Sequence, residues 1–99
     1  MLNWIETKRT KHTAGNKQLP DHIELVAQLP YNHTLIIWSH PYSNGEWTAE
    51  CRDLGFGGKY YWLDTTDMEK AKEVATQEFV KFLSENIAIY SKVYDVTIQ

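Results

Sequence analysis

Short segments that alternate apolar with polar residues, followed by one amphipathic stretch, most constrain the fold of this 99-residue chain. Such alternation is typical of β-strands with one buried face, whereas apolar residues spaced three and four apart are typical of a helix. Three of the four tryptophans, Trp38, Trp47 and Trp62, lie in the alternating segments. The sequence therefore predicts an α+β fold: a four- to five-stranded antiparallel meander sheet with one C-terminal amphipathic helix packed on one face.

Turn residues separate the predicted strands and indicate how they pair. The Asn-Gly pair at 44–45 is the strongest turn signal, and it suits a two-residue type I′ hairpin because both residues tolerate positive φ. This turn would place Trp38 opposite Cys51, and a turn near 31–32 would place Leu25 opposite Trp38. The predicted strands cover residues 23–29, 34–40, 46–54 and 59–64, with 92–99 as a candidate edge strand, whereas residues 8–20 are expected to form a loop.

This register assigns each residue of the predicted sheet to one of two faces. The face that meets the helix would collect Ile23, Leu25, Ala27, Ile36, Trp38, Trp47, Ala49, Cys51, Tyr60 and Trp62. The opposite, outer face is only half polar, and an exposed apolar patch usually marks an interface. Either the N-terminal segment or the C-terminal strand covers this patch, or a partner binds it, and the sequence leaves both alternatives open. The residues that we predict for partner binding are Leu35, Ile37, Glu50, Arg52, Tyr61 and Leu63.

The helix is predicted from about Asp67 to Leu83, and in a longer form to Ile89. Thr66 is expected as its N-cap, and Glu69, three residues later, would complete a capping box. One buried face of the helix is indicated by apolar residues at spacings of three and four, which are Met68, Ala71, Val74, Ala75, Phe79, Phe82, Leu83 and Ile87.

Charge is distributed unevenly along the chain. The net charge is −3, but residues 1–20 carry four basic residues against one acidic residue, which gives +3 and leaves −6 for the rest. We expect residues 1–20 to form a basic, partly ordered N-terminal arm and residues 21–99 a single α+β domain. An acidic chain argues against general nucleic-acid binding, which usually needs a basic face. The exception would be the arm itself, whose basic residues are Lys8, Arg9, Lys11 and Lys17.

The sequence offers little catalytic chemistry. The histidine spacings match no metal motif, and one cysteine cannot contribute to a thiolate cluster. Cys51 and His40 are the candidate pair for nucleophilic catalysis, but a cysteine in the middle of an apolar strand is usually a small buried hydrophobe. We therefore predict a non-enzymatic protein without cofactor or metal. No apolar run of about 20 residues would span a membrane and no signal-peptide run begins the chain, so we expect a cytoplasmic protein.

Three segments carry a resemblance to known proteins. They are residues 1–4 (MLNW), 45–49 (GEWTA) and 61–72 (YWLDTTDMEKAK). The chain resembles a loose class of small phage and prophage proteins with an N-terminal Trp, a central W-x-A strand and a helix start of the type T-x-E-x-A-K. Residues 8–30 and the tail after Leu83 depart from the short form of this pattern. The class implies a sheet-plus-helix fold and a mobile-element origin, and it supplies no catalytic residues.

Two functions are compatible with these observations. The resemblance implies a phage-type protein that binds a macromolecular partner, expected to be a protein, and inhibits a host protein such as a defence nuclease. A homodimer through the outer sheet face is a further option. The alternative is a nucleic-acid-binding module that uses the basic arm for phosphates and exposed aromatic side chains for stacking.

Overall fold

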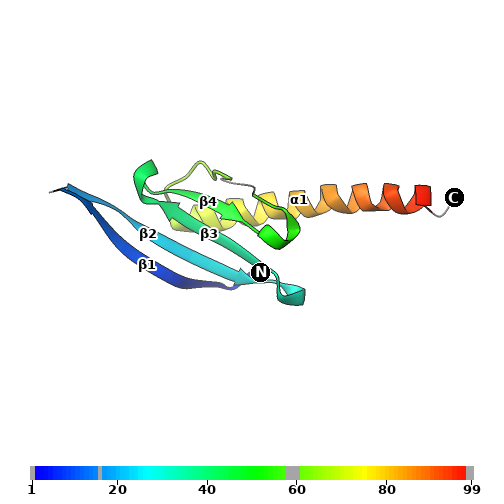
Figure 1. Ribbon diagram of the computed structural model, residues 1–99, viewed down its shortest axis with the longest axis horizontal. Helices are drawn as coiled ribbons and strands as arrows, with labels where there is room; N and C mark the ends of the chain where they lie inside the picture. Colours follow the sequence, from blue (N-terminus) through cyan, green and yellow to red (C-terminus); the bar gives the residue numbers. More distant parts are fainter. Residues whose placement is uncertain (1, 16, 58–60, 98–99) are drawn as a thin grey trace.

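The computed structural model describes residues 2–15, 17–57 and 61–97, with the side chains of all of these except 14 and 88–97. In this part of the chain, four strands form an antiparallel meander of order β1-β2-β3-β4, and one long helix follows (Figure 1). The predicted fold class is confirmed. The elements are β1 (Trp4–Ala14), β2 (Lys17–Gln28), β3 (Thr34–His40), β4 (Glu46–Glu50) and α1 (Met68–Thr97), with short 3₁₀ turns η1 (Pro30–Asn32), η2 (Pro41–Ser43) and η3 (Arg52–Leu54).

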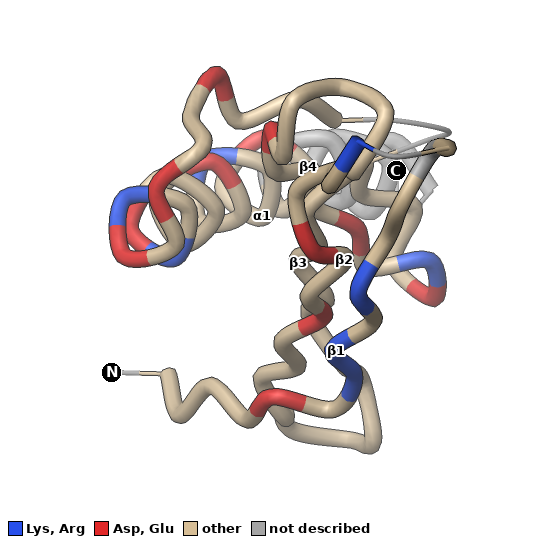
Figure 2. The backbone as a smooth tube through the Cα atoms, turned by 90° about the vertical axis from the view of Figure 1, so that its left-hand side faces the viewer, with Lys and Arg blue, Asp and Glu red and all other residues tan. Residues whose placement is uncertain are grey.

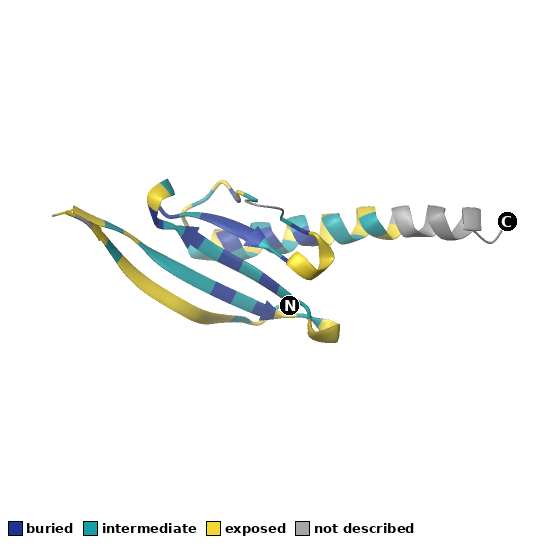
Figure 3. Cartoon of the chain, viewed as in Figure 1, coloured by how far each residue is buried: buried dark blue, intermediate teal, exposed yellow. Residues whose placement is uncertain are grey.

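The core lies between one face of the sheet and the first half of α1 (Figure 3). Helix residues Ala71, Ala75 and Phe79 are buried at spacings of four, as expected for one apolar stripe. The sheet and the loop after β4 supply the other buried apolar side chains, which are Leu25, Ala27, Leu35, Ile37, Trp47, Ala49, Cys51, Phe56 and Leu63. Beyond this packed region α1 continues past the end of the sheet (Figure 1).

The N-terminal segment is a strand, so the expected loop at 8–20 is wrong. β1 and β2 form a long hairpin in which Thr10 pairs with His22, and the turn contains Gly15 with a φ of 63°. The pairing is interrupted by two register shifts, between Glu6 and Lys8 and between Thr10 and His12. Bulges and charged side chains on an exposed edge strand discourage edge-to-edge association. They also remove the apolar alternation by which a strand is recognised in a sequence.

The C-terminal segment is helical where the structure describes it, so the expected strand over 92–99 is wrong for residues 92–97. No Gly or Pro lies between residues 68 and 97, and nothing in the sequence therefore interrupts the helix once it has begun. Its N-cap is Asp67 rather than Thr66, because Asp67 Oδ2 accepts a 2.7 Å hydrogen bond from the Lys70 amide.

The register between strands differs from the predicted one. Trp38 pairs with Glu24 on β2 and with Thr48 on β4, instead of with Leu25 and Cys51. Both shifts are odd numbers of residues, and an odd shift exchanges the two faces of a strand. The cause is loop length: five residues at 29–33, including η1, and five at 41–45, including η2, replace the predicted two-residue turns. Consequently Trp38 faces away from α1.

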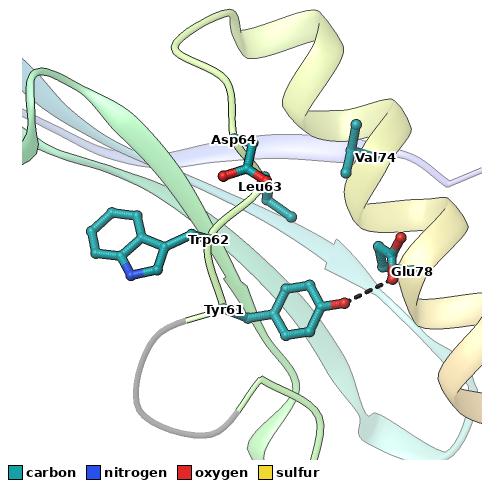
Figure 4. A pocket seen from close by; sticks show the side chains of 6 residues that line it. All are labelled: Tyr61, Trp62, Leu63, Asp64, Val74 and Glu78. Carbon is teal, nitrogen blue, oxygen red and sulfur yellow. Dashed lines mark hydrogen bonds between the residues drawn. The ribbon is translucent and has the colours of Figure 1, made fainter.

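Residues 61–65 run alongside β4 and cover its outer edge. The Ala49 amide donates to the Tyr61 carbonyl oxygen over 3.0 Å, and the Leu63 amide donates to the Trp47 carbonyl oxygen over 2.9 Å. Trp62 forms an isolated antiparallel bridge with Thr48. Successive side chains alternate in this extended segment, so Tyr61 points toward α1 and Trp62 points to the opposite side (Figure 4). The first two residues of the predicted strand at 59–64 lie outside the described residues.

Candidate binding surface

The face of the sheet that α1 leaves open is the candidate functional surface, and we call it the open face. Residues paired across an antiparallel sheet project to the same side. One row of the open face is therefore fixed by successive pairings, and it consists of Lys8, Glu24, Trp38, Thr48 and Trp62. In the described part of the chain, neither terminus covers this face, because β1 extends the sheet at its edge and residues 92–97 continue α1.

Aromatic and imidazole rings gather at one end of the open face. Five of them contact one another in a closed circuit: His12 to His22 (6.3 Å between ring centroids), His22 to Trp38 (5.4 Å), Trp38 to His40 (5.4 Å), His40 to Tyr42 (6.3 Å) and Tyr42 to His12 (6.1 Å). Trp62 adds a sixth ring, with its centroid 6.0 Å from that of His40. We call these six residues the ring cluster.

Five separate segments bring the ring cluster together. His12 follows the second register shift of the β1–β2 hairpin, His22 lies on β2, and Trp38 and His40 occupy alternate positions of β3. Tyr42 lies in η2, which turns the chain immediately after His40. Two rings remain open to solvent, with Tyr42 72% exposed and Trp62 38% exposed. Rings of this kind provide large, rigid contact areas for a ligand or partner.

Basic residues flank the ring cluster on the β1–β2 hairpin. Lys8 lies on the open face, and Lys11 and Lys17 are exposed nearer the hairpin tip. Figure 2 shows basic positions gathered along β1, whereas α1 carries both acidic and basic positions. Arg9 lies on the other side of β1 from Lys8 and pairs with Glu6 and, over 3.7 Å, with Asp21. The four basic residues predicted for a nucleic-acid surface are thus on one hairpin, and three of them are not engaged by Glu6 or Asp21.

Two carboxylates of the open face lie near the ring cluster, and each has a partner in the register of the neighbouring strand. Glu24 pairs with Lys8 in the sheet register and accepts a 2.8 Å hydrogen bond from Thr7 Oγ1. Glu46 lies opposite His40.

Burial lowers the pKa of His22 below its ordinary value, and the positive charge of Lys8 lowers it further. Glu24 acts in the opposite direction, and His12 and His40 add to the lowering. The ring cluster therefore favours the neutral form of His22.

This pKa shift predicts that stability decreases in mild acid. The unfolded chain binds a proton at His22 near the ordinary pKa of 6.5, whereas the folded chain resists protonation there, so the free energy of unfolding falls as pH is lowered through this range. Urea denaturation of the wild type at a pH of about 7.5 and about 5 measures the decrease. The His22→Gln variant should lose less stability over the same interval. An equal loss in the two proteins would contradict the assignment to His22.

The residues predicted for partner binding do not form one exposed patch. Leu35, Ile37 and Leu63 are core residues, with exposed fractions of 0%, 0% and 4%, so their assignment to the outer face is wrong. Tyr61 also faces the helix, where its hydroxyl donates a 2.7 Å hydrogen bond to Glu78 Oε2 (Figure 4). This carboxylate, followed by burial, raises the pKa of Tyr61.

Glu50 and Arg52 are the predicted partner-binding residues that remain near the open face. Glu50 pairs with Ile36 in the sheet and accepts a 2.9 Å hydrogen bond from Arg52 Nε. The Arg52 side chain is exposed in η3. Both residues lie away from the ring cluster, near the end of β3 that is opposite to His40.

A shallow hollow of about 260 Å³ lies between residues 61–64 and α1 (Figure 4). The Glu78 carboxylate, which lines this hollow, accepts a hydrogen bond from the Tyr61 hydroxyl. Leu63, which also lines it, is part of the core. Asp64 brings a second carboxylate to the lining. The Tyr61–Glu78 hydrogen bond joins residues 61–64 to α1 across the hollow.

The candidate catalytic pair is separated by the sheet. Cys51 is buried on the side of α1, and its pKa is raised by burial, whereas His40 belongs to the open face. The hypothesis of a Cys51–His40 pair is therefore contradicted. Among the described residues, no group of three or more His, Cys, Asp or Glu side chains could hold a metal ion. In the same part of the chain, no helix combines the length and the apolar character that membrane crossing requires.

Five members of the ring cluster are not functional candidates in the sequence analysis: Trp38 and Trp62 are predicted in the core, and His12, His22 and Tyr42 are assigned no role. His12 and Tyr42 lie in segments expected to be loop or turn, and His22 lies just before the predicted start of a strand. A usable signal was the spacing of Trp38, His40 and Tyr42 at every second residue, which is the period of one face of a strand.

Comparisons of this chain with protein-family models, with curated proteins and with solved structures found no match. The phage or prophage origin implied by the sequence stays a prediction. The surface itself therefore carries the functional argument.

Proposed function

We propose that this chain is a non-enzymatic binding protein that engages a macromolecular partner through its open face. The observation that carries the proposal is the ring cluster, which concentrates two tryptophans, one tyrosine and three histidines at one end of a sheet face opposite the core. Trp and Tyr are the side chains most enriched at binding hot spots, where they provide contact area at little entropic cost.

The arrangement of the fold supports a binding role for this face. α1 already stabilises the other face, so the aromatic rings of the open face are not needed to complete the core between sheet and helix. Large aromatic side chains that remain partly exposed on a small domain commonly mark an interaction site. Inhibition of a host protein, such as a defence nuclease, would be one consequence of such binding.

Affinity capture with an open-face variant tests the proposal. The double variant Tyr42→Ala/Trp62→Ala removes the two most exposed rings of the cluster, and its circular dichroism spectrum should match that of the wild type. Tagged wild-type protein and variant are incubated with host lysate, and both captured proteins and captured nucleic acids are identified. We expect a partner that the wild type retains and the double variant loses, with affinity reduced at least roughly tenfold.

A matched control separates this surface from general hydrophobicity. The variant Tyr31→Ala/Val80→Ala removes two other exposed apolar side chains, one in η1 and one on α1, both distant from the ring cluster in the fold. It should capture the same partner as the wild type. Equal capture by the open-face variant and the wild type would reject the proposal.

A further inference from the structure

We infer that the partner of the open face is single-stranded nucleic acid, whose bases stack on Tyr42 and Trp62 while its phosphates contact the basic residues of the β1–β2 hairpin. This inference rests on the proposed binding role of the open face and specifies the chemical class of its partner.

Charge complementarity is the first reason. Residues 7–20 contain Lys8, Arg9, Lys11 and Lys17 and no acidic residue. The described residues of this range, 7–15 and 17–20, lie in the distal part of the hairpin, which also carries His12 of the ring cluster. A positively charged ridge beside a group of aromatic rings suits a polyanion with planar bases, because phosphates and bases are held by different parts of the same surface. The rest of the chain is acidic, so the positive charge that suits phosphates is confined to the hairpin side of the molecule.

The geometry of the rings is the second reason. Tyr42 and Trp62 both contact His40, with centroid separations of 6.3 Å and 6.0 Å, and both are open to solvent. Two exposed rings that both contact one imidazole offer stacking positions for neighbouring bases of one strand. In a duplex the base faces are stacked on one another and unavailable, so this surface should prefer single strands.

His22 connects binding to pH. Its protonated imidazole would add positive charge beside the phosphates. The groups that face His22 are Lys8 and His12 on β1, Glu24 on β2 and His40 on β3. A bound phosphate would offset the repulsion from Lys8 and so favour the protonated form of His22. Affinity should therefore increase as pH is lowered from about 8 to about 6.

Fluorescence anisotropy with a labelled oligo(dT) of about 12 nucleotides, and with a duplex of the same length, tests the inference. At low salt, on the order of 20 mM, the wild type should bind the single strand more tightly than the duplex, and affinity should fall as salt is raised. Tyr42→Ala should weaken binding roughly 5- to 100-fold. Tyr31→Ala should leave affinity unchanged, because Tyr31 is 92% exposed in η1 at the other end of β3.

Two triple lysine variants, which have the same net charge as each other, test the phosphate contacts. The triple variant Lys8→Gln/Lys11→Gln/Lys17→Gln should reduce the slope of log affinity against log salt by about 2, since each phosphate contact on a single strand contributes about 0.7. The matched triple variant Lys70→Gln/Lys72→Gln/Lys81→Gln removes the same charge from α1 and should keep the wild-type slope.

Three results would overturn the inference. They are no binding of oligo(dT) at low salt, equal affinity for single strand and duplex, or binding that Tyr42→Ala and the hairpin triple variant both leave unchanged. Capture of a protein through the open face by a chain that does not bind oligo(dT) would also overturn it, while supporting the proposed binding role itself. The two proposals therefore fail on different measurements.

Discussion

Replacing Ile37 with alanine is expected to lower the free energy of unfolding by about 2 to 5 kcal/mol. Ile37 is fully buried on β3, in the row that pairs it with Leu25 and Ala49 beneath α1. The smaller side chain would leave a cavity between sheet and helix that neighbouring side chains fill only in part. Urea denaturation followed by tryptophan fluorescence measures the change, and the midpoint should shift without a large change in slope.

The preceding residue provides the matched control. Ile36 lies on the open face, is only partly buried and pairs with Val26 and Glu50. Ile36→Ala removes the same atoms one position away and should cost roughly 1 kcal/mol or less. Under the register predicted from sequence, the order of the two effects would be reversed, because Ile36 would then face the helix. A larger loss for Ile36→Ala than for Ile37→Ala would contradict the register in the structure.

The two isoleucines show where sequence reasoning succeeded and where it failed. The existence and order of β2, β3 and β4, and the helix after residue 67, follow from apolar periodicity, which is a local property of the chain. Register is set by loop geometry, and the Asn44-Gly45 signal was interpreted as the whole turn. In the structure Asn44 and Gly45 have positive φ, as predicted, but they follow Pro41–Ser43 in a five-residue connection. The two connections that flank β3 are both longer than predicted, and the two faces of β3 are therefore exchanged.

The candidate surface was accessible from the sequence only in part. The basic residues of the hairpin and the role of exposed aromatics were recognised, because charge asymmetry can be counted without a structure. Trp38 and Trp62 were placed in the core, since large apolar rings are normally buried there. His12 and His22 became neighbours through a bulged hairpin whose polar strand carries no periodic apolar signal. The ring cluster depends on these long-range pairings, which no local pattern encodes.

Gly57→Ala is expected to destabilise the fold by about 3 kcal/mol or more, for two reasons that act together. Gly57 has a φ of 100°, which side-chain-bearing residues rarely adopt. An added Cβ would also lie against the Ala49 carbonyl oxygen and 2.9 Å from Glu50 Cα, so backbone would have to move. The substitution should lower the thermal midpoint by more than 10 °C, on the basis of about 4–8 °C per kcal/mol for a domain of this size.

The close approach of Gly57 also affects the binding surface. Phe56, immediately before it, exchanges two backbone hydrogen bonds with Cys51 at the end of β4 and packs against Phe79 and Phe82 of α1. A displacement of Phe56 and Gly57 should weaken the contact between β4 and residues 61–65, which include Trp62. We therefore expect Gly57→Ala to increase the quenching of tryptophan fluorescence by iodide at a temperature where the variant is still folded.

Gly55→Ala separates backbone strain from close packing. Gly55 also has a positive φ, of 78°, but nothing lies within 4 Å of the position that a Cβ would occupy. Strain alone should cost about 1–2 kcal/mol at this position. Equal destabilisation by the two substitutions would show that the segment after Phe56 does not press against β4. A distinctly larger effect at Gly57, together with exposure of Trp62, would show that this contact holds the open face in place.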